Sequence, residues 1–282
     1  MIDRRIAAVL VVFLVSAAAH AQGEAKPFRP LPLGDVLLTL PTSHMPERGT
    51  WEVKFSHRFN QSIDEGEAVH SLFGLDSGAN VTMGLSYVPM RDLQIAVARS
   101  NVLDTFEMSA KYLVFQQAAA IPVSAALRGG ADWRSERNVD DRVSWFAQAI
   151  VSRQFGSRAA VYAMPTFVTN AGRASSGDAS VALFENAFNV PVGASFMVRR
   201  GLSLVVEIIP PNGDLPESVD ADFGWAFGIK QALGGHWFEV LLTNNNATTA
   251  DQYTTSTYQG AGLRSGDIQL GFNIERRFGR RR

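Results

Sequence analysis

Apolar and polar residues alternate with a period of two along most of this chain. From Trp51 to Asn60 the residues Trp, Val, Phe, His and Phe lie on one face of an extended strand, and Glu, Lys, Ser, Arg and Asn lie on the other. The same alternation recurs at 106–114, 123–134, 223–230 and 268–277. Long helical periodicity is absent after the first 21 residues, and glycines that disfavour helix interrupt several of these runs. The pattern therefore predicts an all-β fold.

Turn-forming residues divide the chain into about twelve predicted strands. Their ranges are 50–60, 78–88, 92–100, 105–116, 122–134, 143–155, 158–170, 181–198, 202–209, 222–231, 236–244 and 267–278. Short connections (89–92, 117–121, 156–157, 199–201 and 232–235) alternate with longer polar ones (61–77, 135–142, 171–180, 210–221 and 245–266), and only 101–104 is shorter than this alternation predicts. Short turns at one end and long loops at the other are typical of transmembrane β-barrels.

We therefore expect a closed antiparallel transmembrane β-barrel of about 12 strands, with both termini on the short-turn side. A soluble β-sandwich or a lipocalin-like barrel in the periplasm has the same period and is the alternative. The composition favours the membrane barrel, because 19% of the residues are charged whereas soluble domains have about 25%. A face that contacts lipid cannot carry the charge of a soluble surface.

The first 21 residues are predicted to be a signal peptide. Arg4 and Arg5 precede an apolar run over 6–19, and Ala19-His20-Ala21 is a small-x-small cleavage site. The run is shorter than the roughly 20 residues of a membrane-spanning helix, so an N-terminal anchor is the less favoured alternative. We expect cleavage after Ala21, export, and insertion into the bacterial outer membrane.

The mature chain is predicted to have three parts. Residues 22–49 begin with a proline-rich stretch that cannot be a central strand. They form either a disordered leader or a plug that folds into the lumen. Residues 50–278 form the barrel, and residues 279–282 form a basic tail.

The available side chains exclude several kinds of chemistry. The chain has no cysteine and has 26 basic against 27 acidic residues, which excludes thiolate sites and argues against a nucleic-acid partner. The mature histidines (His44, His57, His70 and His236) lack metal-binding spacing, and no GxSxG motif occurs. We therefore expect no metal, no cofactor and no catalytic residue. A membrane-embedded hydrolase is a less favoured alternative.

The polar face of the strands supplies the candidate functional residues. Twelve charged side chains are predicted to line the lumen: Glu52, Lys54, Arg58, Glu107, Lys111, Arg128, Asp132, Arg134, Lys230, Glu239, Glu275 and Arg277. Basic and acidic residues are mixed, so they either order polar solutes in a pore or pair across a narrow barrel and close it. Pairing is favoured for most of them, because an unpaired charge is costly where water is scarce.

Two further expectations concern aromatic residues and one loop. Five tryptophans fall on predicted strands, and several lie near strand ends, where a belt of aromatic rings is expected at the membrane interfaces: Trp51, Trp133, Trp145, Trp225 and Trp237. The loop 244–266 is rich in Asn and Thr. We expect it to be a solvated outer cap, with a sugar or peptide site as the alternative.

Several motifs resemble a known family. GLDSGANVTMGLSYV at 74–88, GGHWFEVLLTNN at 234–245 and GDIQLGFNIERRF at 266–278 are similar to a family of bacterial outer-membrane β-barrels, the domain of unknown function 5777. The resemblance spans roughly residues 35–278. It implies an outer-membrane barrel and leaves the activity open, because these motifs build a barrel and are no catalytic signature. Barrels of this kind tend to end on an aromatic residue, whereas Phe278 is followed by GRRR.

The favoured function is a narrow or plugged channel for small polar solutes, with outer-membrane lipid and the solute as partners. The alternative is a closed structural or assembly barrel whose outer loops bind a partner. The sequence does not decide the solute or the oligomeric state.

Overall fold

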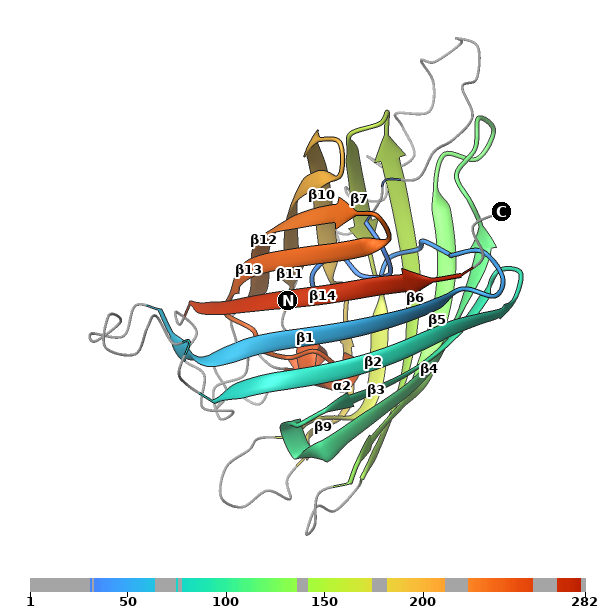
Figure 1. Ribbon diagram of the computed structural model, residues 1–282. Coiled ribbons are helices and arrows are strands. Elements are labelled where there is room, and N and C mark those ends of the chain that lie inside the picture. The colour runs from blue at the N-terminus through green and yellow to red at the C-terminus, as the bar shows by residue number, and fades with distance from the viewer. Residues whose placement is uncertain are drawn as a thin grey trace.

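The computed structural model describes residues 31, 33–63, 75, 78–135, 142–173, 182–210, 223–255 and 268–279. The predicted signal peptide and residues 280–282 of the predicted tail lie outside this part of the chain. Antiparallel strands form one closed barrel, and the first and last strands lie side by side (Figure 1). Within the described ranges, no helix is long and apolar enough to cross a membrane.

Strand segments make up most of the barrel. The first seven are β1 (Trp51–Ser62), β2 (Ala79–Met90), β3 (Leu93–Ser100), β4 (Thr105–Phe115), β5 (Ser124–Arg134), β6 (Val143–Phe155) and β7 (Ala159–Ala163). The others are β8 (Thr166–Arg173), β9 (Ala182–Asn189), β10 (Val192–Arg199), β11 (Leu202–Ile209), β12 (Gly224–Leu233), β13 (His236–Thr243) and β14 (Gln269–Phe278). A 3-10 turn, η3 (Val102–Asp104), connects β3 to β4. A short helix, α2 (Ala250–Thr255), lies between β13 and β14.

The fourteen segments form twelve barrel strands, as predicted. The predicted strand 158–170 is divided into β7 and β8 near Pro165, and the predicted strand 181–198 is divided into β9 and β10 near Pro191. Proline has no N–H group for the ladder, which explains both interruptions. Each prolyl oxygen still accepts a backbone bond, from the Ala149 N–H at 3.0 Å and the Met164 N–H at 2.8 Å. The pairings β1–β14 and β5–β6 complete the closure.

The two faces of the wall differ as the alternation predicts. Large apolar side chains cover the outside, with Met83 and Trp145 both 63% exposed, whereas the buried polar residues face inward. Trp237 is not part of the expected aromatic belt, because it is only 6% exposed. Trp237 shares the inward parity of Glu239 and lies beneath the guanidinium of Arg277, whose Cζ is 4.6 Å from the ring centroid.

The contact between β4 and β5 requires a glycine. A Cβ at Gly130 would lie 2.1 Å from the Met108 carbonyl oxygen and 2.9 Å from the Ser109 Cα. We predict that Gly130→Ala destabilises the barrel by about 3 kcal/mol or more, because backbone atoms of β4 would have to move. The measurement is the urea concentration at which the heat-modifiable gel migration of the folded barrel is lost. We expect this concentration to be lower for the variant than for the parent chain. The control is Gly129→Ala, whose Cβ would meet its nearest atom at 3.5 Å. Equal stability of both variants would contradict the prediction.

Candidate functional site

Residues 33–50, here called the N-terminal segment, enter the barrel: residues 33–46 are buried or partly buried inside it, and Glu47, Arg48 and Gly49 are exposed. The segment contacts inward-facing side chains of strands on opposite sides of the lumen, including Arg58 on β1, Ser152 on β6 and Glu207 on β11. The segment turns back on itself as a hairpin, with a Leu37 N–H to Leu40 C=O bond of 2.8 Å and a bridge between Val36 and Pro41. Residues 33–46 therefore occupy the lumen from the short-turn end.

The tip of this hairpin is held by one carboxylate. Glu207 accepts hydrogen bonds from the backbone N–H groups of Leu38, Thr39 and Leu40, at 2.8, 3.0 and 2.9 Å. The Leu38 carbonyl in turn accepts from the Arg58 Nη2 at 3.2 Å and from the Asn273 Nδ2 at 2.7 Å. A turn buried inside a barrel must have its backbone groups satisfied, and the lumen wall provides the partners.

Two lysines hold the remainder of the hairpin. The Lys230 ammonium donates to the carbonyls of Val36 and Leu37 at 2.7 and 3.3 Å. Lys111 forms an ion pair with Asp35 and donates to the carbonyls of Thr42 and His44 at 3.2 and 2.9 Å. These charged side chains thus bind the backbone of the N-terminal segment.

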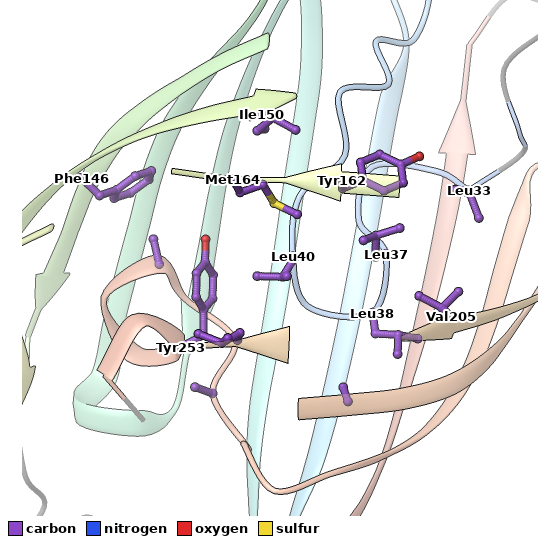
Figure 2. Packing of buried hydrophobic residues seen from close by; sticks show 14 of the residues in the cluster. Leu33, Leu37, Leu38, Leu40, Phe146, Ile150, Tyr162, Met164, Val205 and Tyr253 are labelled. Atoms are coloured by element: carbon purple, nitrogen blue, oxygen red, sulfur yellow. The ribbon is translucent and has the colours of Figure 1, made fainter. Parts of the chain in front are cut away.

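The leucines of the segment face an apolar part of the wall. Figure 2 shows Leu37 and Leu40 among side chains that include Ile150, Tyr162 and Met164. Each leucine that is fully buried contributes about 1.5–3 kcal/mol by leaving water. The apolar inward residues of the wall thus gather on β6 to β11, among polar ones such as Gln148 and Glu207, whereas β1, β2, β4 and β14 present mostly polar residues inward.

A second element enters the lumen from the long-loop end. Residues 244–255, here called the inserted loop, contain α2, and Asp251 of this helix pairs with Arg134 at 2.7 Å. The Thr248 and Thr82 hydroxyl oxygens are 2.6 Å apart, and the Ala250 N–H donates to Glu107 at 2.9 Å. The expectation of a solvated cap is therefore wrong for these residues. They are buried because the wall offers charged partners to their backbone and side chains.

All twelve residues predicted to line the lumen lie on the inward face of their strands. Nine of them are buried, and Lys54, Arg128 and Arg277 are partly buried. Seven of these charges form direct ion pairs within the wall: the pairs are Arg128–Glu107, Lys230–Glu239, Lys230–Glu275 and Arg277–Glu52. Asp132 accepts a hydrogen bond from the Asp251 N–H at 3.0 Å. Of the four other cations, three bind the two elements inside the lumen: Arg58, Lys111 and Arg134.

Three acidic partners were not predicted from the sequence: Asp35, Glu207 and Asp251. Glu207 shares the parity of the buried Ser203 on β11, and this pattern in LSLVVEII was the available signal. Asp35 and Asp251 lie outside the strands, where parity gives no indication of direction.

A small cavity separates the N-terminal segment from the inserted loop. It measures about 70 Å³, room for a few water molecules. Asp35, Lys54, Lys111, Arg128 and Tyr253 are among the residues that line it. A solute too large for this cavity therefore needs at least one of the two elements to move.

Two titratable groups of the N-terminal segment depend on this packing. Burial acts to raise the pKa of the Asp35 carboxyl, but the charges of Lys111, Lys54 and Arg128 outweigh it and lower the pKa to about 2. Burial lowers the pKa of the His44 imidazole, and the cations around it lower it further, to about 3. The neutral imidazole Nε2 lies 3.3 Å from the Arg277 Nη1, as a hydrogen-bond acceptor would.

In the described residues, no group of three or more His, Asp or Glu side chains is placed to hold a metal ion.

Comparisons with known proteins place the chain in one family. The model of the family described as "Membrane bound beta barrel domain (DUF5777)" matches residues 34–278. A comparison with curated proteins gave no match.

Several solved structures are similar in shape. The NanC porin has 6% sequence identity over 82% of this chain and 100% of that chain, with a TM-score of 0.47. The COG4313 outer membrane channel from Pseudomonas putida F1 has 11% identity over 83% and 97%, with a TM-score of 0.46. Outer membrane phospholipase A from Escherichia coli has 9% identity over 82% and 91%, with a TM-score of 0.42. These values are too low to carry an argument about fold or function.

Proposed function

The chain belongs to the DUF5777 family of membrane-bound β-barrel domains, and from this premise we propose that it is a channel for small polar solutes that the N-terminal segment closes. The barrel lies in the bacterial outer membrane, reached by export and by cleavage of the signal peptide after Ala21. The role is transport and not catalysis. Release of the segment opens the lumen, and the inserted loop narrows its outer half.

The attachment of the N-terminal segment supports this proposal. Charged side chains of the wall, including Arg58, Glu207 and Lys230, bind the backbone of the segment. Water can replace every one of these contacts, so a released segment leaves a charged and hydrated lumen. A barrel with a purely structural role gains more from an apolar interior, because buried charges contribute little net stability.

A substitution in the segment itself tests the proposal. Gly34 has a φ of +73°, and a Cβ there would lie 2.8 Å from the Glu275 Oε2 and 3.3 Å from the Trp237 ring. Gly34→Val therefore opposes docking of the segment and leaves every strand unchanged. In planar bilayers we expect the full-length variant to conduct at least about tenfold more often than the parent chain, as a loss of about 1.4 kcal/mol in docking predicts.

Gly49→Val is the matched control. Gly49 also has a positive φ, +83°, but a Cβ there would meet no atom within 4 Å. We expect this variant to remain closed. A second opening variant is Leu37→Asn, which places an amide where a fully buried leucine packs. If both opening variants fold and neither conducts, the channel proposal is overturned and the closed structural barrel is supported.

A further inference from the structure

We infer that the solute of this channel carries a carboxylate, and that Asp35 occupies the carboxylate site while the channel is closed. The inference rests on the proposed channel function and adds the class of solute. It starts from one observation: the N-terminal segment brings a carboxylate of its own into a cluster of cations on the lumen wall.

Lys111 is the centre of this cluster. Among the described residues, all of its hydrogen-bond and ion-pair partners belong to the N-terminal segment: the Asp35 carboxylate and the carbonyls of Thr42 and His44. The Lys111 side chain is only 4% exposed. When the segment leaves, the Lys111 ammonium loses its counter-ion and both carbonyl acceptors together. Such a group favours an anion in the vacated position.

Two further cations face the same place. The positive charges of Lys54 and Arg128 act on Asp35 together with that of Lys111 and help to keep its carboxyl ionised. All three cations line the cavity between the segment and the inserted loop. Within the described part of the chain, Lys54 forms no ion pair and no hydrogen bond, so its charge is available to a solute.

The acidic residues of the cavity are already engaged. Glu52 pairs with Arg277 at 2.8 Å, and Glu107 pairs with Arg128 and accepts from the Ala250 N–H at 2.9 Å. Both of these pairs lie in the wall and persist when the segment leaves. Removal of Asp35 therefore leaves a net positive site, with Lys54 and Lys111 uncompensated.

The Asp35 side chain, which occupies the site in the closed channel, indicates that the solute is a small molecule with a carboxylate. Asp35 presents a carboxylate on a single methylene, and the hydroxyl-bearing Ser86 and Ser109 line the same cavity. A small hydroxylated carboxylate matches both the cations and the serines.

The test measures ion selectivity in the opened full-length chain. In a KCl gradient, we expect the Gly34→Val channel to be at least about threefold more permeable to chloride than to potassium, because cations line the constriction. Lactate or gluconate should reduce the chloride current, whereas the same concentration of uncharged glycerol should not. Adding Lys111→Gln should lower the chloride preference at least about twofold and relieve the carboxylate block, while Lys111→Arg should retain both.

The outcomes separate the two proposals. No current from the folded opening variants overturns the channel itself. A current that prefers potassium, or one that lactate and gluconate do not block, overturns the carboxylate site and leaves the channel standing. Block by inorganic phosphate but not by either carboxylate also overturns it.

Two more variants complete the design. If Lys111→Gln does not fold, Lys54→Gln is used and should lower the chloride preference in the same direction; unchanged selectivity in a folded variant overturns the inference. Arg99→Gln is the charge control, because Arg99 is 48% exposed and pairs with Asp104. We expect no change from it.

Discussion

Oxidation of a Ser43→Cys/Ser152→Cys pair should abolish the current of the Gly34→Val channel, and reduction should restore it. The two hydroxyl oxygens are 2.6 Å apart, one on the N-terminal segment and one on β6. This separation is close to that of a disulfide, about 2.05 Å between sulfurs. The chain has no other cysteine, so one defined bond forms. We expect a loss of more than about 90% of the current, since a tethered segment stays near its docked position at a high effective concentration.

The chain offers a matched tether for comparison. Thr82 and Thr248 also have hydroxyl oxygens 2.6 Å apart, and a cysteine pair there fixes the inserted loop to β2. We expect its oxidation to leave the current of Gly34→Val in place, because the N-terminal segment remains free to leave. Persistent current in the oxidised Ser43/Ser152 pair would show that the N-terminal segment is not the gate, and loss of current only in the oxidised Thr82/Thr248 pair would assign the gate to the inserted loop.

Acidification from pH 7 to pH 5 should release the N-terminal segment. The pKa of His44 is about 3 when the segment is docked, and about 6.5 when the imidazole is in water. The released state therefore binds the extra proton, so docking is strongest above about pH 6.5 and weakens as the pH falls toward 3. At pH 5 the loss is about 2 kcal/mol, which raises the released fraction roughly 25-fold over its value at pH 7.

On balance, the charges around His44 lower its pKa, as burial does. Arg277, Lys111 and Lys230 oppose its protonation, and Asp35 alone favours it. Asp35 itself, with a pKa of about 2, adds acid sensitivity only below about pH 4.

Open probability against pH in planar bilayers measures the effect, and protease cleavage within residues 33–50 of reconstituted protein provides an independent measure. His44→Gln is the control, because glutamine does not titrate and its amide oxygen still accepts from Arg277. We expect the response between pH 7 and pH 5 to disappear in this variant. An identical response in both chains would show that His44 is not the titrating group.

The wall of the barrel could be predicted from the sequence because strand parity is a local property. Inward positions on β1, which include Glu52 and Arg58, recur at every second residue, so neighbouring residues alone define the face. The turns are equally local, and only the two interruptions near Pro165 and Pro191 divide what was predicted as single strands. Tryptophan is usually found at membrane interfaces, but Trp237 lies inside the barrel because its position on the strand has inward parity. The residue type alone therefore does not predict where a side chain lies.

What fills the lumen was decided only by the tertiary structure. The Leu38 N–H and Glu207 are 169 residues apart, and Lys111 and Asp35 are 76 residues apart. Contacts across the lumen leave no periodicity in the sequence, because residues 33–50 and 244–255 are irregular and their direction depends on the surrounding wall. The sequence by itself thus determined a membrane barrel with a charged interior. Inside the closed barrel these charges have little water. They therefore bind the chain's own backbone and the carboxylates of Asp35 and Asp251, which only the tertiary structure reveals.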